Sequence, residues 1–199
     1  MKTRDIDIRR SLKHSLTLQF NDDPNTLILD ELGLCQGVAR VDIAVVNGSL
    51  HGYEIKSEKD TLARLPGQIN IYNKVLDEIT IITGQCHLEN VMKIIPYWWG
   101  IQIAEMDEEK YVVLNTIRKP EKNPDIDSYS IAQLLWREEA LDLLRRFELE
   151  KGFISKPRQK IWEKLSHSFS LVDLKYYVRE QIKSRQNWRS ETQQMICGD

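Results

Sequence analysis

The chain has 199 residues, enough for one well-buried core with a smaller region attached and too few for two large domains. Hydrophobic residues make up 41% of the sequence and charged residues 29%, which is typical of a globular protein and excludes a disordered one. The 28 basic and 30 acidic residues nearly cancel, so the net charge by itself indicates no class of partner.

The first elements in chain order are a helix and three short extended segments. Residues 5–20 carry an apolar residue at about every fourth position, which is the period of an amphipathic helix. Residues 27–34 form a short apolar element, and residues 40–46 and 50–56 alternate as two strands of a hairpin around Asn47-Gly48. The elements that follow are a helix at 66–77, a strand at 78–83, a helix at 88–95 and strands at 99–104 and 111–117.

A polar link with two prolines, residues 118–125, separates this part from a helical region. The apolar pattern there predicts a helix over residues 131–147 and further helices at 157–166 and 171–184. The sequence therefore predicts an α/β core, residues 1–124, followed by a helical C-terminal annex, residues 125–199. Residues 145–189 contain 12 Lys and Arg against 5 Asp and Glu, which slightly favours contact with DNA over ordinary solvated helix faces.

Three cysteines, Cys35, Cys86 and Cys197, are widely spaced and include no Cys-x-x-Cys pair. This pattern argues against a disulfide framework and favours a reducing compartment. The start of the chain is polar, and the longest apolar run, residues 94–104, is too short to span a bilayer. We therefore expect a cytoplasmic protein without a signal peptide or a membrane segment.

The hairpin carries the most informative residues, Asp42 on its first strand and Glu54 and Lys56 on its second. Glu54 and Lys56 share a face because side chains alternate along a strand. A two-residue turn would place Asp42 on the opposite face, whereas a three-residue loop, Val46 to Gly48 with Gly48 left-handed, brings both carboxylates together. The apolar alternation favours the three-residue loop.

Two carboxylates on one face repel each other by about 4 kcal/mol at 4 Å and an effective dielectric of 20. A divalent cation relieves this repulsion, and oxygen ligands of this kind suit Mg²⁺ or Mn²⁺. Lys56 is then placed to orient a water molecule or to stabilise charge on a phosphate. The alternative is a surface ion pair between Asp42 and Lys56 beside a solvated Glu54.

Gln68 and Tyr72 lie one helical turn apart downstream of the hairpin. Together with Val41-Asp42 and Glu54-Ile55-Lys56 they resemble the PD-(D/E)XK nuclease superfamily, including the Q-x-x-x-Y element of its RecB-like branch. The resemblance implies a restriction-endonuclease-like mixed central sheet flanked by helices. It also implies metal binding by Asp42 and Glu54, assistance to water attack by Lys56, and substrate contacts from Gln68 and Tyr72.

Two further residues are assigned by this resemblance. Glu31 is the candidate for the additional metal-binding glutamate that an early helix often supplies in the superfamily. Arg40, on the strand of Asp42, is assigned to substrate binding with Gln68 and Tyr72. Val41 replaces the signature proline, and no cysteine cluster of the iron–sulfur type accompanies the motif.

A wider set of residues is similar to a family of small, uncharacterised bacterial proteins of that superfamily. The matching segments are Glu54-Ile55-Lys56-Ser57, Asp60 to Leu65, Pro96 to Gly100, Leu134 to Arg137, and Trp188-Arg189. Within them, Trp98 and Trp99 are expected to be core residues more often than base-stacking ones. The scattered histidines indicate no zinc site.

We therefore expect a Mg²⁺- or Mn²⁺-dependent deoxyribonuclease that hydrolyses phosphodiester bonds, with endonuclease and exonuclease action both left open. DNA is the expected partner, a membrane is not, and a homo-oligomer is an open possibility. One alternative is a catalytically silent module with a nuclease fold that binds nucleic acid or a partner protein. Another is a structural protein whose charges are indifferent to metal.

Overall fold

A six-stranded mixed sheet forms the centre of the structure, a computed structural model in which residues 3–185 are described. The strands lie side by side in chain order: β1 (Leu27–Leu34), β2 (Ala39–Val46), β3 (Leu50–Lys56), β4 (Glu78–Thr83), β5 (Gly100–Met106) and β6 (Val112–Arg118). The pairs β3–β4 and β4–β5 are parallel and the other neighbours are antiparallel. The short apolar element at residues 27–34 is thus a strand.

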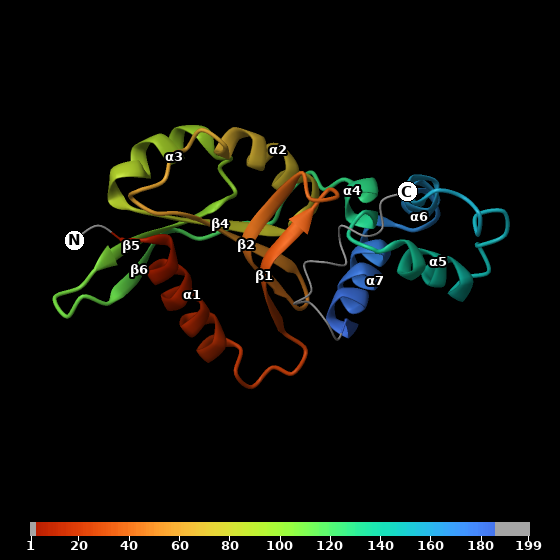
Figure 1. The fold of residues 1–199 in the computed structure, drawn as a ribbon, viewed down its shortest axis with the longest axis horizontal. Coiled ribbons are helices and arrows are strands. Elements are labelled where there is room, and N and C mark those ends of the chain that lie inside the picture. Colours follow the sequence, from red (N-terminus) through yellow and green to blue (C-terminus); the bar gives the residue numbers. More distant parts are fainter. Residues whose placement is uncertain (1–2, 186–199) are drawn as a thin grey trace.

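Helices cover both faces of this sheet (Figure 1). On one face lie α2 (Leu65–Val75) and α3 (Leu88–Ile94), which connect the parallel strands, with the short 3₁₀ helix η1 (Gln85–His87) before α3. On the other face lies α1 (Asp5–Gln19), packed against β3 and β6. The predicted α/β architecture, a mixed sheet flanked by helices, is confirmed.

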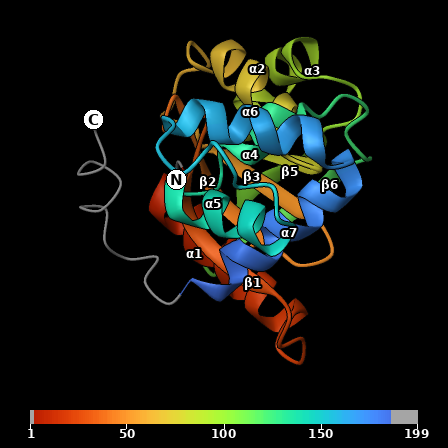
Figure 2. The same cartoon turned by 90° about the vertical axis from the view of Figure 1, so that its right-hand side faces the viewer.

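The C-terminal annex is helical, as predicted, and stands at one end of the sheet (Figures 1 and 2). It contains α4 (Ser128–Ala132), α5 (Arg137–Arg146), α6 (Arg158–Ser168) and α7 (Leu171–Ser184). The prediction of a single helix over residues 131–147 is wrong, because the helical structure is interrupted between α4 and α5. A new helix starts there, where the Glu139 carboxylate accepts the backbone N–H of Trp136 at 2.7 Å.

Two hydrophobic clusters lie on the two faces of the sheet. The cluster under α1 contains Ile43, Tyr53 and Ile55. The larger cluster on the other face joins the sheet to α2 and to all four annex helices, and both Trp98 and Trp99 belong to it, as expected. Because both faces are covered, polar side chains on the central strand β3, such as Glu54 and Lys56, are buried.

The hairpin loop differs in detail from the prediction. The last paired residues are Val46 and Leu50, so the loop consists of residues 47–49. Gly48 does not have the positive φ of a bulge, and the Asn47 side chain instead closes the turn by accepting the N–H of Ser49 at 3.0 Å. The loop still has three residues, and the observed ladder runs from the pair Val46–Leu50 to the pair Ile43–Tyr53 and stops before Asp42 and Glu54.

Trp188, Arg189 and Cys197 lie outside the described residues. Among the residues that are described, no helix combines the length and the apolar character needed to cross a membrane.

Candidate active site

The strands β2 and β3 separate at the position of Asp42 and Glu54. Their ladder ends with the pair Ile43–Tyr53, and Asp42 and Glu54 are the next residues on each strand. Regular alternation also breaks here, since Val41 packs in the cluster of α2 whereas Ile43 packs in the cluster of α1. The Asp42 carboxylate turns into the gap and accepts the backbone N–H of Ile55 through Oδ2 at 2.7 Å.

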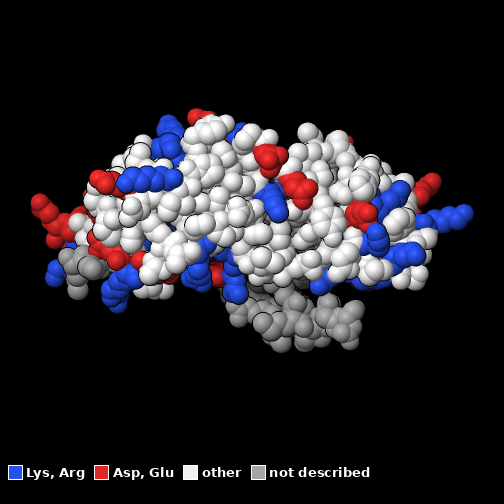
Figure 3. All heavy atoms as spheres, turned by 90° about the horizontal axis from the view of Figure 1, so that it is seen from above, with Lys and Arg blue, Asp and Glu red and all other residues white. Residues whose placement is uncertain are grey.

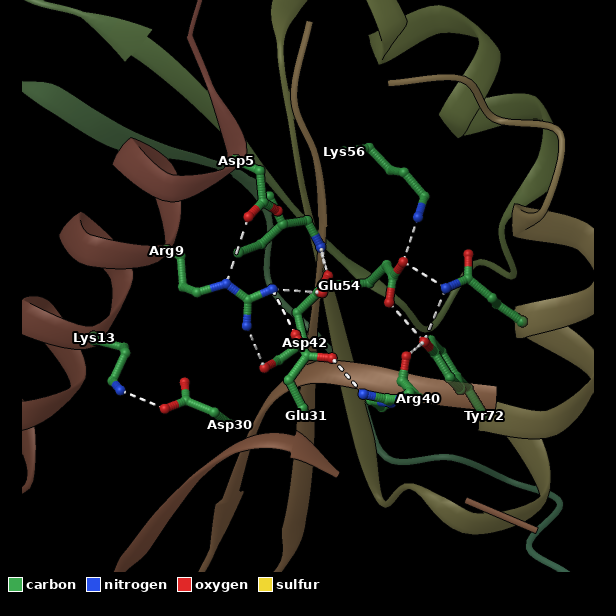
Figure 4. A network of polar contacts seen from close by, with 12 residues as sticks. Asp5, Arg9, Lys13, Asp30, Glu31, Arg40, Asp42, Glu54, Lys56 and Tyr72 are labelled. Atoms are coloured by element: carbon green, nitrogen blue, oxygen red, sulfur yellow. Dashed lines mark hydrogen bonds and ion pairs between the residues drawn. The ribbon is translucent and has the colours of Figure 1, made fainter. Parts of the chain in front are cut away.

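Helix α2 supplies the groups that hold Glu54. Its Oε1 accepts the amide of Gln68 at 2.6 Å and also contacts Lys56 Nζ, and its Oε2 lies 2.6 Å from the Tyr72 hydroxyl. That hydroxyl is also 2.6 Å from the carbonyl oxygen of Arg40. Figure 4 shows the side chains of Glu54, Lys56 and Tyr72 meeting between α2 and the two strands. The one-turn spacing of Gln68 and Tyr72 therefore points both side chains at a single carboxylate.

Burial distinguishes this cluster from a surface ion pair. Glu54 is 2% exposed and Lys56 is 5% exposed, so the alternative of a surface pair beside a solvated glutamate is wrong. The ammonium of Lys56 pairs with Glu54 rather than with Asp42. Gln68 and Tyr72 of α2 contribute to this burial, and the alternation of β3 alone could not predict it.

Both carboxyl groups have perturbed acidity. Burial raises the pKa of Glu54, and the negative charge of Asp42 raises it further, while Lys56 and Tyr72 act in the opposite direction. Burial also raises the pKa of Asp42, against the lowering effects of the Ile55 N–H and of Arg9. The two carboxylates are thus close enough to interact, and each favours its neutral form more than an exposed acid does.

Arg9, on α1, is the functional candidate that sequence reasoning missed. Its Nη2 contacts Asp42 Oδ1 at 2.8 Å and Glu31 Oε1 at 2.9 Å, and its Nη1 donates to the Asp42 carbonyl oxygen at 2.8 Å. Asp5 lies 3.5 Å from its Nε. Periodicity places Arg9 on the polar side of α1, next to buried Ile8, but nothing in the sequence connects it with residues on β1 and β2.

Glu31 lies on β1, not on an early helix, and its backbone is unusual. Its φ is 57°, in the left-handed region, and it is skipped in the ladder, where Asp30 pairs with Ile43 and Leu32 with Val41. A residue other than glycine held there costs on the order of 1 kcal/mol and is typical of functional sites. Its carboxylate pairs with Arg9 and, at 3.6 Å, with Arg40.

The donor set is suited to a hard divalent cation, because Asp42 and Glu54 bring oxygen ligands to one buried gap whose like charges repel. A third ligand does not join them: within residues 3–185, no three His, Cys, Asp or Glu side chains are grouped closely enough to hold a metal ion. Glu31, expected as that ligand, is occupied by arginines instead.

Comparison with known proteins gives a family match and two individual similarities. The family described as bacteriophage P4 protein cII matches residues 7–196 of this chain. Protein cII of Enterobacteria phage P4 is 27% identical over 158 residues, which cover 79% of this chain and 59% of that protein. A protein of unknown function from Silicibacter pomeroyi has 18% identity, covers 67% of this chain and 84% of its own, and gives a TM-score of 0.38, too low to support any argument.

Proposed function

The chain belongs to the family of bacteriophage P4 protein cII, and we propose that it is a metal-dependent nuclease of the PD-(D/E)XK type that hydrolyses phosphodiester bonds in DNA. The observation that carries the proposal is the convergence of Asp42, Glu54 and Lys56 where β2 and β3 separate. A restriction-endonuclease-like fold is part of the same proposal, supported by the mixed sheet with helices on both faces. The chain spans 59% of the length of the curated relative it matches, so the activity of the whole protein is included in this proposal.

In this proposal each polar side chain has a distinct task. Asp42 and Glu54 hold Mg²⁺ or Mn²⁺, which supplies a Lewis acid at a phosphoryl oxygen. Lys56 orients the attacking water and stabilises the charge that develops on the phosphate. Gln68 and Tyr72 fix the Glu54 carboxylate in place, since both are bonded to it.

Glu31 and Arg40 lie on β1 and β2 near Asp42, and their side chains are 40% and 56% exposed to solvent. Arg40 is therefore suited to contact a DNA phosphate entering there, through charge-assisted hydrogen bonds. This is the role expected for it from the sequence. Gln68 and Tyr72, which were expected to contact substrate, are turned toward Glu54 and act in this proposal as positioning residues.

The annex offers a more distant surface for the DNA backbone. Seven of its described basic residues are engaged in ion pairs: Arg137, Arg145, Lys160, Lys175, Arg179, Lys183 and Arg185. Exposed Arg146, Lys151 and Lys156 have no carboxylate partner among the described residues. Figure 3 shows Lys and Arg gathered at the end of the molecule that the annex forms. A patch of this kind supports sequence-independent phosphate binding.

One observation favours the second candidate function, a catalytically silent module that binds DNA or a partner protein. All four carboxylate oxygens of Asp42 and Glu54 already have partners within the chain. A site that is internally satisfied in this way is stable without a cation. The nuclease proposal therefore requires that one of these partners gives way.

The test is cleavage of single-stranded, duplex and branched DNA with and without Mn²⁺, using wild type, Asp42→Asn and Lys56→Met. We expect metal-dependent cutting by the wild type and a loss of at least about 100-fold in both variants, because Asp42→Asn removes a charged metal ligand and Lys56→Met removes the cation that stabilises charge on the phosphate. Chelation of the metal is expected to abolish cutting by the wild type.

Lys59→Met is the matched control, since Lys59 is an exposed lysine three residues after Lys56 and is expected to leave cutting unchanged. Circular dichroism of each variant verifies that it is folded. Metal-dependent binding of DNA without cutting would contradict the nuclease and support the silent module. Cutting that survives in Asp42→Asn would assign the activity to another site or to a contaminant.

A further inference from the structure

The positively charged side chain of Arg9 lies among three carboxylates. Its guanidinium contacts the Asp42 carboxylate and the Glu31 carboxylate, and Asp5 lies on its third side (Figure 4). Three acidic side chains from α1, β1 and β2 thus converge on one positive group, whose side chain is 18% exposed. The Asp42 side chain is 19% exposed, whereas those of Glu31 and Asp5 are 40% and 47% exposed, so the guanidinium compensates one mostly buried carboxylate and two exposed ones.

The same contacts occupy the groups that a divalent ion would use. Arg9 Nη2 donates a hydrogen bond to Asp42 Oδ1, and the backbone N–H of Ile55 donates one to Oδ2 of the same carboxylate. Arg9 also holds the Asp42 carbonyl oxygen and draws Glu31 toward itself. The left-handed backbone of Glu31 directs that side chain to Arg9 rather than along the regular ladder.

We propose that Arg9 is the resident cation of the site and competes with the divalent metal for Asp42. A metal ion then binds only when the guanidinium withdraws from Asp42, and α1 sets the affinity by how firmly it holds Arg9 there. Asp5, one turn before Arg9 on the same helix, provides an acceptor to which the guanidinium can withdraw. The inference rests on the proposed function, because it concerns the metal site of the nuclease.

The test is Mn²⁺ binding by isothermal titration calorimetry, with full-length wild type, Arg9→Met and Arg9→Lys. Arg9→Met keeps an unbranched stem and removes the charge, so we expect Mn²⁺ to bind at least 10-fold more tightly than to the wild type. Arg9→Lys keeps the charge without the planar fork and is expected to lie between the two. The Tm of Arg9→Met is expected to fall without metal and to rise more with Mn²⁺ than that of the wild type does.

Lys13→Met is the matched control, because Lys13 lies one turn further along α1 and pairs with exposed Asp30 outside the site. Its Mn²⁺ affinity is expected to equal that of the wild type. Arg9→Met combined with Asp42→Asn is expected to lose the gain in affinity, which assigns the bound ion to this site. Arg9→Lys serves as the folded comparison if Arg9→Met does not fold.

Affinity in Arg9→Met and Arg9→Lys that is equal to or weaker than in the wild type would overturn the proposal, and so would absence of Mn²⁺ binding in all variants. The outcome for the nuclease is separate. Tighter Mn²⁺ binding without DNA cleavage supports the competing role of Arg9 and contradicts the nuclease. Cleavage by wild type with no effect of Arg9 on affinity contradicts only the role of Arg9.

Discussion

At the residue scale, single polar contacts hold buried charges that the surrounding core would otherwise exclude. The Glu54 carboxylate receives hydrogen bonds from Gln68, Tyr72 and Lys56, which come from two different elements. Burial raises the pKa of the Tyr72 hydroxyl well above its usual range, and the nearby Glu54 carboxylate raises it further. A tyrosine in this position remains a neutral hydrogen-bond donor at any physiological pH.

His51, on β3, is the residue whose protonation is expected to affect folding most clearly. Its ring stacks on Tyr53 with centroids 4.2 Å apart, and its Nε2 lies 2.9 Å from Thr80 Oγ1. Burial lowers the pKa of His51 to about 4, and Lys122 acts in the same direction while Glu78 opposes them. Between pH 6.5 and about 4, the folded protein therefore keeps the His51 imidazole neutral, whereas the same imidazole in the unfolded chain is protonated.

Stability is expected to fall as the pH drops from 6.5 toward about 4, because the unfolded state then binds a proton that the folded state does not. The contribution of His51 over that window is at most about 3 kcal/mol. His51→Gln is expected to reduce the slope of unfolding free energy against pH, measured by urea denaturation between pH 4 and pH 8. His14→Gln, at an exposed position on α1, is the control and is expected to retain the wild-type slope. Equal slopes in wild type and His51→Gln would refute this assignment.

At the element scale, one buried carboxylate adds polar contacts to the hydrophobic cluster that joins the annex to the sheet. Asp77, between α2 and β4, is 4% exposed and accepts the N–H of Leu50 at 2.8 Å. The same carboxylate pairs with Lys175, and Arg179 lies 3.8 Å away, both on α7. The Asp77 carboxylate thus binds the backbone of the first residue of β3 and also pairs with two side chains of α7, the last helix of the annex.

Asp77→Asn is expected to destabilise the protein by about 3 kcal/mol, because it leaves two partly buried cations without their partner. Hydrogen exchange should show the loss of protection mainly in α7, and urea denaturation measures its size. Asp142→Asn is the control, since Asp142 pairs with Arg145 on the surface of α5 and should change stability by less than about 0.5 kcal/mol. If the two variants were equally stable, Asp77 would not be the attachment point.

At the scale of the whole molecule, the larger hydrophobic cluster crosses the predicted boundary between residues 1–124 and the annex. It runs without interruption from Leu29 on β1 to Ile182 on α7. Gly52 marks how closely the layers approach, because a Cβ there would lie 2.5 Å from Leu76 and 3.1 Å from Val41. The division into two domains stays a prediction, and the cluster makes cooperative unfolding the expected behaviour.

We therefore expect one thermal transition, with a calorimetric enthalpy equal to the van't Hoff enthalpy. Tryptophan fluorescence and far-ultraviolet circular dichroism should report the same midpoint, since Trp99 lies beside the sheet and Trp162 lies in the annex within one cluster. A fragment of residues 1–124 should unfold at a lower temperature than the full chain. Two separate transitions in the full chain would instead establish two independent domains.

Much of the fold follows from local patterns. The period of apolar residues is sufficient to predict α1, the hairpin and the helical annex, because periodicity reports which side of an element is buried. The same pattern predicts Asp42 and Glu54 on a common side, but the alternation breaks between Val41 and Ile43. Asp42 therefore meets Arg9 from α1, whereas Glu54 meets side chains from α2. Gln68 and Tyr72 fall together because they are one helical turn apart.

The sequence by itself pointed to the candidate residues Asp42, Glu54, Lys56, Gln68 and Tyr72, through spacing within one or two neighbouring elements together with the resemblance to the PD-(D/E)XK superfamily. Only the tertiary structure decided that Glu54 and Lys56 are buried, that Glu31 lies on a strand, and that Arg9 occupies the acidic cluster. The physical reason is distance along the chain: Arg9 and Asp42 are 33 residues apart, and no local period reports a contact made by packing a helix across a sheet.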